Sequence, residues 1–325
     1  MNTQKATAIA HPNIAFIKYW GNRDQNLRIP ATDSLSMNLD GLTTRTEVNF
    51  DSSLQTDILH INAQLADDLA QQRIGEFLNH VRLLAGIKTY AFVKSENNFP
   101  MGTGIASSAS AFAALSLAAS VAAGLDLSEG ELSRLARRGS GSASRSVPAG
   151  FVLWKAGTSD LESFAQSIAS PDHWELVDCI AIVSDLHKST GSSDGHPLAQ
   201  TSPVQALRIE HTERNINICQ KAICERDFET FAQVTELDCN LMHAVMMTSE
   251  PPLHYWQPAT LAIIQAVKSW RAAGLPVCYT IDAGPNVHVI TKKATSQQVS
   301  ANLRDIPGVS DVLTAAPGGP ARIIS

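Results

Sequence analysis

The stretch NNFPMGTGIASSAS, residues 97–110, constrains the fold of this 325-residue chain more than any other feature. It carries two glycines and four small hydroxylated side chains, and an alanine-rich run with helical character, AFAALSLAASVAAGL, follows at once. Unpaired N–H groups and the dipole at a helix N-terminus attract phosphate even without a lysine. Gly102 and Gly104 let the backbone approach an anion closely, and Ser107 and Ser108 offer hydroxyl groups. The stretch therefore predicts either a phosphate-binding loop or a tight strand-to-helix turn.

Composition narrows the class of protein. The formal net charge of -6 argues against a nucleic-acid-binding surface. No run approaches the roughly 18 apolar residues that span a bilayer, and the N-terminus lacks the apolar core and cleavage site of a signal peptide. The five cysteines are odd in number and share no CxxC spacing. We therefore expect free thiols in a cytoplasmic protein that binds neither nucleic acid nor membrane.

The pattern of expected elements changes along the chain. The first part mixes alternating segments typical of strands, such as ATAIAHPNIAFIKYW and TRTEVNFD, with helical spacing over ADDLAQQRIGEFLNHVRLLAG, which stops at Gly86. A capping box, Ser128 with Glu131, starts another helix. From about residue 200 the pattern is nearly all helical, and VCYTIDAGPNVHVITK then indicates strand–turn–strand. We predict an α/β (α+β) chain of two domains, residues 1–185 and 186–325.

Three further stretches carry polar groups at the ends of expected elements. Lys18 follows the apolar segment NIAFI, and Asp282 stands between an apolar strand and a Gly-Pro turn. The segment RRGSGSASRS offers Ser140, Ser142 and Arg145, which suit a carboxylate or a phosphate because arginine binds either with two hydrogen bonds. Each has a plainer interpretation: a surface lysine, a turn aspartate and a polar loop after a helix. Spacing alone does not bring these residues together.

Their combination closely resembles the mevalonate diphosphate decarboxylase family, a branch of the GHMP kinase superfamily. The matching pieces are HPNIAFIKYWGNRD, SENNFPMGTGIASSASAFAAL, LARRGSGSASRS and YTIDAGPN, in the family's order, from near residue 8 to at least residue 290. The resemblance implies an N-terminal α/β domain of the kind found in a ribosomal protein and a C-terminal ferredoxin-like domain. It places the active site in the cleft between them and implies a homodimer.

The resemblance also implies a reaction and roles for residues. ATP phosphorylates the 3-hydroxyl of a 5-phosphorylated mevalonate, and phosphate then leaves together with carbon dioxide. Asp282 would accept or orient the hydroxyl proton, Lys18 would stabilise the transferred phosphate, and Arg145 would hold the carboxylate. The implied substrate-binding set is Asn13, Ala15, Tyr19, Asn22, Ser140, Ser142 and Arg145.

The implied cofactors are ATP, as co-substrate, and Mg²⁺ bridging its phosphates. Ser108 is the candidate metal ligand, and HKSTGSSDGH lies where the family has a mobile lid. The implied ATP-binding set is Asn97, Gly102, Thr103, Gly104, Ser107, Ser108, Lys188, Ser192 and Ser193.

The chain departs from the family pattern near its substrate-binding segment. Members that use the diphosphate commonly read KYWGKRD, whereas this chain has Asn22 at the second lysine. Where many members have a proline followed by TNSS or similar, this chain has IPATDSLS, with Asp33. The pattern RDxxLRxPxxDS, with YWQP at Tyr255–Pro258, is similar to phosphomevalonate decarboxylases. Asn22 removes one positive charge and Asp33 adds one negative charge, which suits a substrate with one phosphate fewer. The product of that substrate would be isopentenyl phosphate. The alternatives are a diphosphomevalonate decarboxylase, a kinase that stops at the 3-phosphate and a non-catalytic nucleotide-binding module.

Overall fold

The computed structural model describes residues 5–99, 107–184 and 191–325. The predicted ATP-binding residues Gly102, Thr103, Gly104 and Lys188 lie outside these ranges.

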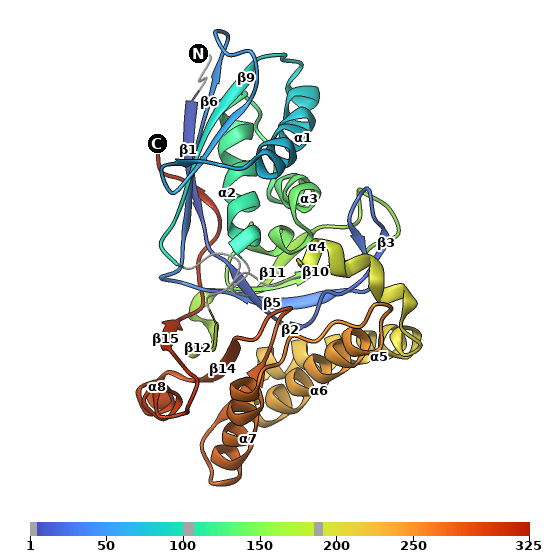
Figure 1. The fold of residues 1–325 in the computed structure, drawn as a ribbon, viewed down its shortest axis with the longest axis vertical. Coiled ribbons are helices and arrows are strands. Elements are labelled where there is room, and N and C mark those ends of the chain that lie inside the picture. The colour runs from blue at the N-terminus through green and yellow to red at the C-terminus, as the bar shows by residue number, and fades with distance from the viewer. Residues whose placement is uncertain (1–4, 100–106, 185–190) are drawn as a thin grey trace.

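The upper part of the molecule in Figure 1 is a sheet covered on one face by helices. Strand β6 carries the predicted TRTEVNFD alternation, and its residues alternate between buried and half-buried as a one-sided sheet requires. The strands, in spatial order, are β16 (Arg322–Ile323), β1 (Lys5–Ala10), β6 (Thr44–Asp51), β9 (Tyr90–Asn97), β7 (Ile58–Ile61) and β8 (Gln64–Leu65).

Helices α1 (Asp68–Ala85), α2 (Ser107–Ala122) and α3 (Glu129–Gly139) pack against this sheet. The predicted ends are confirmed: α1 ends at Gly86, which adopts the left-handed conformation at φ 67°, and the Ser128–Glu131 capping box is present at α3. The alanines of α2 are mostly buried, so the helix packs closely against β1 and β6.

A second sheet crosses the middle of the molecule. Its strands, in spatial order, are β11 (Ala165–Ala169), β10 (Phe151–Trp154), β5 (Ser34–Asn38) and β2 (Asn13–Ile17), and the small hairpin β3 (Asn22–Asp24) with β4 (Ile29–Pro30) follows β2. The expectation of one continuous strand over residues 6–20 was wrong. Pro12, which has no N–H to donate, separates β1 from β2, and the two strands belong to different sheets.

The third sheet is antiparallel and lies in the lower part of Figure 1. Its strands, in spatial order, are β13 (Val277–Thr280), β14 (Val287–Lys292), β12 (Leu176–Ile182) and β15 (Asp311–Ala315). The remaining helices are α4 (Ser192–Gly195), α5 (Gln205–Glu225), α6 (Phe228–Met247), α7 (Pro258–Ala272) and α8 (Ser296–Arg304). One apolar cluster joins α5 and α6 to strands of both this sheet and the middle one, so the two halves share a core.

The α/β (α+β) fold class is confirmed, with a mixed arrangement of helices and several sheets. The boundary between residues 185 and 186 stays a prediction. Strand β12 precedes that boundary but pairs with β14 and β15, and the late strand β16 returns to pair with β1.

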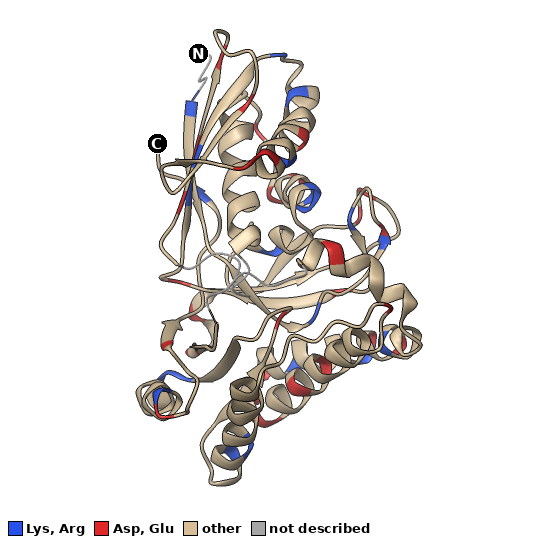
Figure 2. Cartoon of the chain, viewed as in Figure 1, with Lys and Arg blue, Asp and Glu red and all other residues tan. Residues whose placement is uncertain are grey.

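In the described ranges, no helix is long and apolar enough to cross a membrane. Lysine and arginine residues lie interspersed with aspartate and glutamate over the outer helices of both halves (Figure 2).

Candidate active site

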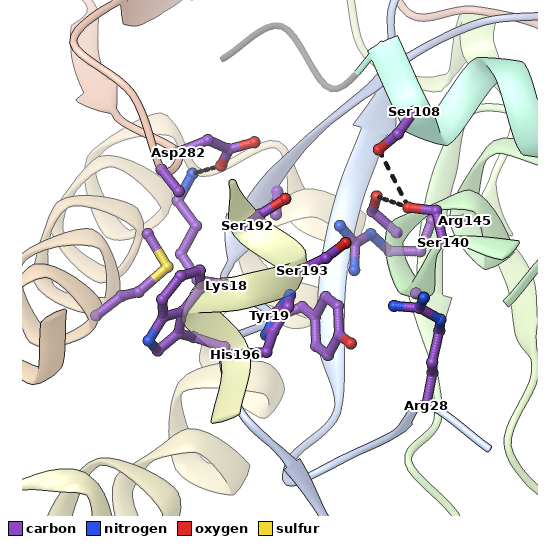
Figure 3. Close-up of a pocket in the computed structure, with 16 residues that line it drawn as sticks. Lys18, Tyr19, Arg28, Ser108, Ser140, Arg145, Ser192, Ser193, His196 and Asp282 are labelled. Carbon is purple, nitrogen blue, oxygen red and sulfur yellow. Dashed lines mark hydrogen bonds and ion pairs between the residues drawn. The ribbon is translucent and has the colours of Figure 1, made fainter. Parts of the chain in front are cut away.

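One polar pocket lies where the middle sheet, the segment after α3, helix α4 and the loop after β13 meet (Figure 3). It brings together residues that are far apart in the sequence, which spacing alone could not do. The predicted site residues that line it are Ala15, Lys18, Tyr19, Ser108, Ser140, Ser142, Arg145, Ser192, Ser193 and Asp282. Its other lining residues are Trp20, Arg28, Gly141, His196, Met242 and Ala283.

Lys18 and Asp282 form an ion pair at one side of the pocket. Lys18 Nζ lies 2.6 Å from Asp282 Oδ1; the lysine side chain is 1% exposed, whereas the aspartate side chain is 27% exposed. Burial raises the pKa of Asp282, but the charges of Lys18, His288 and Arg145 and the hydrogen bond from Lys18 outweigh burial and hold the pKa below its usual value. Asp282 is therefore an ionised carboxylate that remains open to a ligand.

Two buried charges fix the backbone of Lys18. Its N–H donates to Asp238 Oδ2 on α6 at 2.7 Å, and its carbonyl accepts a hydrogen bond from Arg208 Nη2 on α5 at 2.6 Å. Asp238 and Arg208 are almost fully buried. The sequence analysis missed both, because they stand among many other charged residues in helical segments and no local signal sets them apart.

Arg145 lies across the pocket from this pair (Figure 3), in a short 3₁₀ segment, Gly141–Ser146, that follows α3. Its Nη1 donates to Ser34 Oγ at 2.6 Å and its Nε to Asn13 Oδ1 at 3.2 Å. Burial lowers the pKa of Arg145 to about 10, although the charges of Asp282 and Tyr19 raise it. The side chain therefore stays charged at neutral pH. Within the described chain, no carboxylate forms an ion pair with Arg145. An anionic ligand could therefore form an ion pair with this guanidinium.

Asn13 supports this segment from behind instead of lining the pocket. Its amide donates to the carbonyl of Ser142 at 3.0 Å and to Ser146 Oγ at 2.8 Å. Figure 3 shows the hydroxyls of Ser108 and Ser140 in contact, at 3.1 Å, and Ser140 Oγ lies 3.4 Å from Ser142 Oγ. A row of three hydroxyls thus runs along one wall of the pocket.

Tyr19 lies against the same segment. A Cβ on Gly141 would come within 2.5 Å of the Tyr19 ring, so this position requires glycine. The tyrosine hydroxyl donates to Asn22 Oδ1 at 2.5 Å, and the Asn22 amide donates to Gln25 Oε1 at 2.8 Å. Burial raises the pKa of Tyr19 to about 12. Asn22 therefore lies behind Tyr19, with its amide already hydrogen-bonded, and does not line the pocket.

Asp33 does not face the pocket. Its carboxylate accepts a hydrogen bond from the backbone N–H of Ala156 at 2.7 Å, and it is absent from the pocket lining. The aspartate therefore places no negative charge beside a substrate, and this part of the reasoning for a monophosphate substrate does not hold.

Arg28 and His196 line the pocket and were missed. Arg28 sits in the β3–β4 hairpin with φ 51°; its Nε donates to the carbonyl of Arg138 at 3.2 Å, and Figure 3 shows its guanidinium beside Tyr19. The His196 ring stacks on Tyr19, with centroids 4.1 Å apart. Arg28 lies in RDxxLRxPxxDS and His196 in HKSTGSSDGH, two stretches that the sequence analysis had already compared with the family. Both residues could therefore have been included among the predicted site residues.

A second pocket lies on the other side of Ser108. Its lining comes from β6, β7, β9, α1 and α2. Apolar side chains form the larger part of it, and the polar lining residues are Thr46, Arg73, Ser95, Asn97, Ser107 and Ser108. The predicted residues Asn97, Ser107 and Ser108 line it, and Ser108 is shared with the polar pocket. Arg73 closes one side, stacked over the Phe112 ring at 4.8 Å. An apolar slot with a few polar groups suits a flat heterocycle such as a nucleotide base.

The two halves of the chain match models of known domain families. Residues 10–165 match the diphosphomevalonate decarboxylase-like N-terminal domain. Residues 179–317 match the mevalonate 5-diphosphate decarboxylase C-terminal domain.

Individual relatives cover nearly the whole chain. A diphosphomevalonate decarboxylase of Ganoderma lucidum is 36% identical, over 92% of this chain and 81% of its own length. A phosphomevalonate decarboxylase of Haloferax volcanii is 33% identical over 98% of each chain. A solved structure of the protein MDDEF, in complex with MVAPP, AMPPCP and magnesium, is 36% identical, covers 99% of both chains and superposes with a TM-score of 0.94.

Proposed function

The chain belongs to the diphosphomevalonate decarboxylase family of ATP-dependent lyases, and we propose that its substrate is 5-phosphomevalonate, which it converts with ATP to isopentenyl phosphate. The observation that carries the proposal is the polar pocket, which has an ionised carboxylate paired with a lysine at one side and a buried arginine at the other. This arrangement fits a molecule that carries a hydroxyl to be activated and a carboxylate to be held.

Asp282 is the proposed proton acceptor. As the 3-hydroxyl oxygen attacks the γ-phosphorus, its proton passes to the carboxylate, and the bond from phosphorus to the leaving ADP oxygen breaks. Lys18, 2.6 Å from Asp282, supplies positive charge beside the transferred group. The low pKa of Asp282 suits this step, because a tertiary alcohol gives up its proton only as the phosphorus is attacked.

Arg145 is the proposed clamp for the substrate carboxylate. The bond between C1 and C2 breaks to release carbon dioxide, its electron pair forms the double bond between C2 and C3, and phosphate leaves C3. A guanidinium fixed by Ser34 and Asn13 aligns the carboxylate for this loss. Its hold ends when the carboxylate becomes neutral carbon dioxide, so the clamp does not trap the product.

The second pocket is the proposed site for the base of ATP. Ser108, shared by the two pockets, would lie where the phosphates pass from one to the other. Magnesium bound by those phosphates would offset their charge, and Ser108 is the proposed protein ligand, since Mg²⁺ keeps most of its water and takes few protein groups. Ser192 and Ser193, at the start of α4, remain the proposed contacts to the nucleotide from the other side.

The monophosphate preference is supported by the charges near Tyr19. Asn22 is neutral and its amide is already hydrogen-bonded. Among the described lining residues, the cations are Lys18, which is paired, Arg145, which is assigned to the carboxylate, and Arg28. A second phosphate group brings roughly one more negative charge, and in a partly buried site an unpaired charge is costly. One remaining guanidinium therefore favours one phosphate.

The alternative substrate is 5-diphosphomevalonate, because diphosphomevalonate decarboxylase is the more frequent name among the relatives of this chain. A mevalonate-phosphate 3-kinase is a further alternative, because it too would need a carboxylate clamp. Incubation of the protein with ATP and each substrate separates these three enzyme functions, and turnover of either substrate excludes a non-catalytic nucleotide-binding module. Carbon dioxide released in step with ADP from the monophosphate supports the proposal, release only from the diphosphate supports the alternative, and ADP without carbon dioxide indicates a kinase.

A homodimer and a cytoplasmic location are further parts of the proposal. Sedimentation of the purified protein at several concentrations tests the first, and fractionation of the source cells tests the second.

A further inference from the structure

A second ion pair is buried in the C-terminal sheet, away from the pocket surface. His288 Nδ1 on β14 lies 2.6 Å from Asp178 Oδ2 on β12, and the two side chains are 1% and 0% exposed. The other carboxylate oxygen, Asp178 Oδ1, has no hydrogen-bond partner among the described residues. Among the described residues, the side-chain hydrogen bond of this buried carboxylate is therefore the one to His288. The mechanism proposed above uses neither residue.

The register of the sheet places this pair behind Asp282. His288 lies directly opposite Thr280 in the β13–β14 ladder, so their side chains share one face of the sheet. That face is turned towards β2, because Thr280 Oγ1 donates to the carbonyl of Ala15 at 3.3 Å, and Ala15 lines the polar pocket. Asp282 follows Thr280 by two residues. The imidazole therefore belongs to the wall that presents the proposed proton acceptor.

Charges couple the two pairs. Burial lowers the pKa of His288, but the carboxylates of Asp178 and Asp282 outweigh burial and Lys18 and raise that pKa above its usual value. In the other direction, burial raises the pKa of Asp282, and Lys18, His288 and Arg145 lower it. After Lys18, the His288 imidazolium is thus the cation with the largest influence on Asp282, ahead of Arg145.

The His288 charge can keep the pKa of Asp282 low under conditions in which Lys18 alone cannot. When substrates bind, phosphate groups bring negative charge beside Asp282 and attract the Lys18 ammonium, and both effects raise the pKa of the carboxylate. His288 is fixed to Asp178 inside the sheet and cannot turn to a ligand. Its charge therefore continues to act on Asp282 while the pocket is occupied.

We propose that His288 is a positioning residue for the reaction: its imidazolium, fixed by Asp178, keeps Asp282 in the ionised form that accepts the hydroxyl proton. This inference rests on the proposed role of Asp282. It holds for a monophosphate or a diphosphate substrate, because neither His288 nor Asp178 lines the polar pocket.

The kinetic test is the pH profile of kcat at saturating ATP and substrate. We expect H288Q to move the acid limb of the profile upward by about one pH unit, the effect of losing a nearby opposite charge. D178N should move it in the same direction, because the imidazole then loses the partner that keeps it protonated. The ATP KM should change little in either variant.

The matched control is E236Q. Glu236 forms another largely buried pair in the same domain, with Arg271, and accepts a hydrogen bond from the backbone of β13, but it does not line the pocket. This variant should lose stability and keep the acid limb of the wild type. A purely structural role for His288 predicts the same for H288Q, so an unchanged acid limb in folded H288Q overturns the proposal.

A measurement without turnover keeps the proposal testable if H288Q does not fold. NMR titration of the histidine side chains in the wild type should show that the pKa of His288 lies above the usual histidine value, and D282N should lower that pKa because one carboxylate is lost. A neutral His288 at pH 6, or the same titration in D282N, overturns the proposal. If the wild type turns over neither mevalonate phosphate, the proposed function fails while this titration still measures the coupling.

Discussion

The two pockets that share Ser108 differ in the charges and in the elements that line them. The polar pocket holds Lys18, Arg28, Arg145 and Asp282 and draws its walls from both halves of the chain. The second pocket belongs to the N-terminal half alone; among its described lining residues Arg73 is the charged one, and most of the others are apolar. One pocket can therefore stabilise charges that change during a reaction, whereas the other can hold a flat group in place.

This difference separates chemistry from binding. Asp282 and Arg145 of the polar pocket should affect kcat, because their proposed contacts are with atoms whose bonds change. Residues of the second pocket should affect the KM for ATP and leave kcat almost unaltered. The predictions below use this separation, starting with the largest expected effect.

Replacement of Asp282 by asparagine should have the largest effect. The change keeps the shape of the side chain and removes the proton acceptor, so we expect kcat to fall at least about 100-fold. ATP binding, measured by calorimetry or fluorescence, should remain close to that of the wild type. Activity near the wild-type level would rule out Asp282 as the base.

Replacement of Arg145 by glutamine should have the second-largest effect on activity. Loss of a charge-assisted hydrogen-bonded pair costs roughly 10- to 100-fold in kcat/KM for the mevalonate substrate. Lysine at this position should not restore full activity, since it lacks the planar fork that binds two oxygens. Steady-state kinetics of both variants provide the check, and full rescue by lysine would contradict a two-point grip on the carboxylate.

Replacement of Arg28 by glutamine should have a smaller effect, which we expect for the mevalonate substrate and not for ATP. The KM for the mevalonate substrate should rise about tenfold, the effect of one charge at a partly exposed site. Arg23, on the same hairpin but exposed, provides the control, and R23Q should leave this KM unchanged. Equal effects of the two variants would show that Arg28 has no specific role.

Replacement of Ala111 by leucine fills part of the second pocket and should have the smallest effect. We expect the KM for ATP to rise about fivefold with kcat nearly constant, because added methyl groups occupy space intended for the base. Val121→Leu, on the same helix but outside the pocket, is the control. A fall in kcat with an unchanged KM for ATP would contradict the separation of the two pockets.

Local signals in the sequence predicted local structure well. The Ser128–Glu131 capping box, the stop at Gly86 and the alternation of β6 depend on neighbouring residues, and all three are confirmed. The expected continuous strand over residues 6–20 failed because alternation does not reveal that two halves of a segment join different sheets.

The site itself depends on contacts that no local pattern contains. Lys18 and Asp282 are 264 residues apart, and their place in one active site was expected only from a resemblance to a known family. The direction of Asp33, the support of Lys18 by Asp238 and Arg208 and the approach of Arg28 to Tyr19 follow from tertiary packing. A sequence can offer the right residue types, but the fold decides which way each one points.

The most direct test of the substrate proposal is the ratio of kcat/KM for 5-phosphomevalonate and 5-diphosphomevalonate, measured as carbon dioxide release with ATP. We expect the wild type to favour the monophosphate and Asn22→Lys to move the ratio towards the diphosphate, by about 1–2 kcal/mol for one charge acting through an effective dielectric constant near 20. Asp33→Ser, whose carboxylate faces Ala156, should leave the ratio unchanged. A wild-type enzyme that favours the diphosphate would contradict the monophosphate assignment.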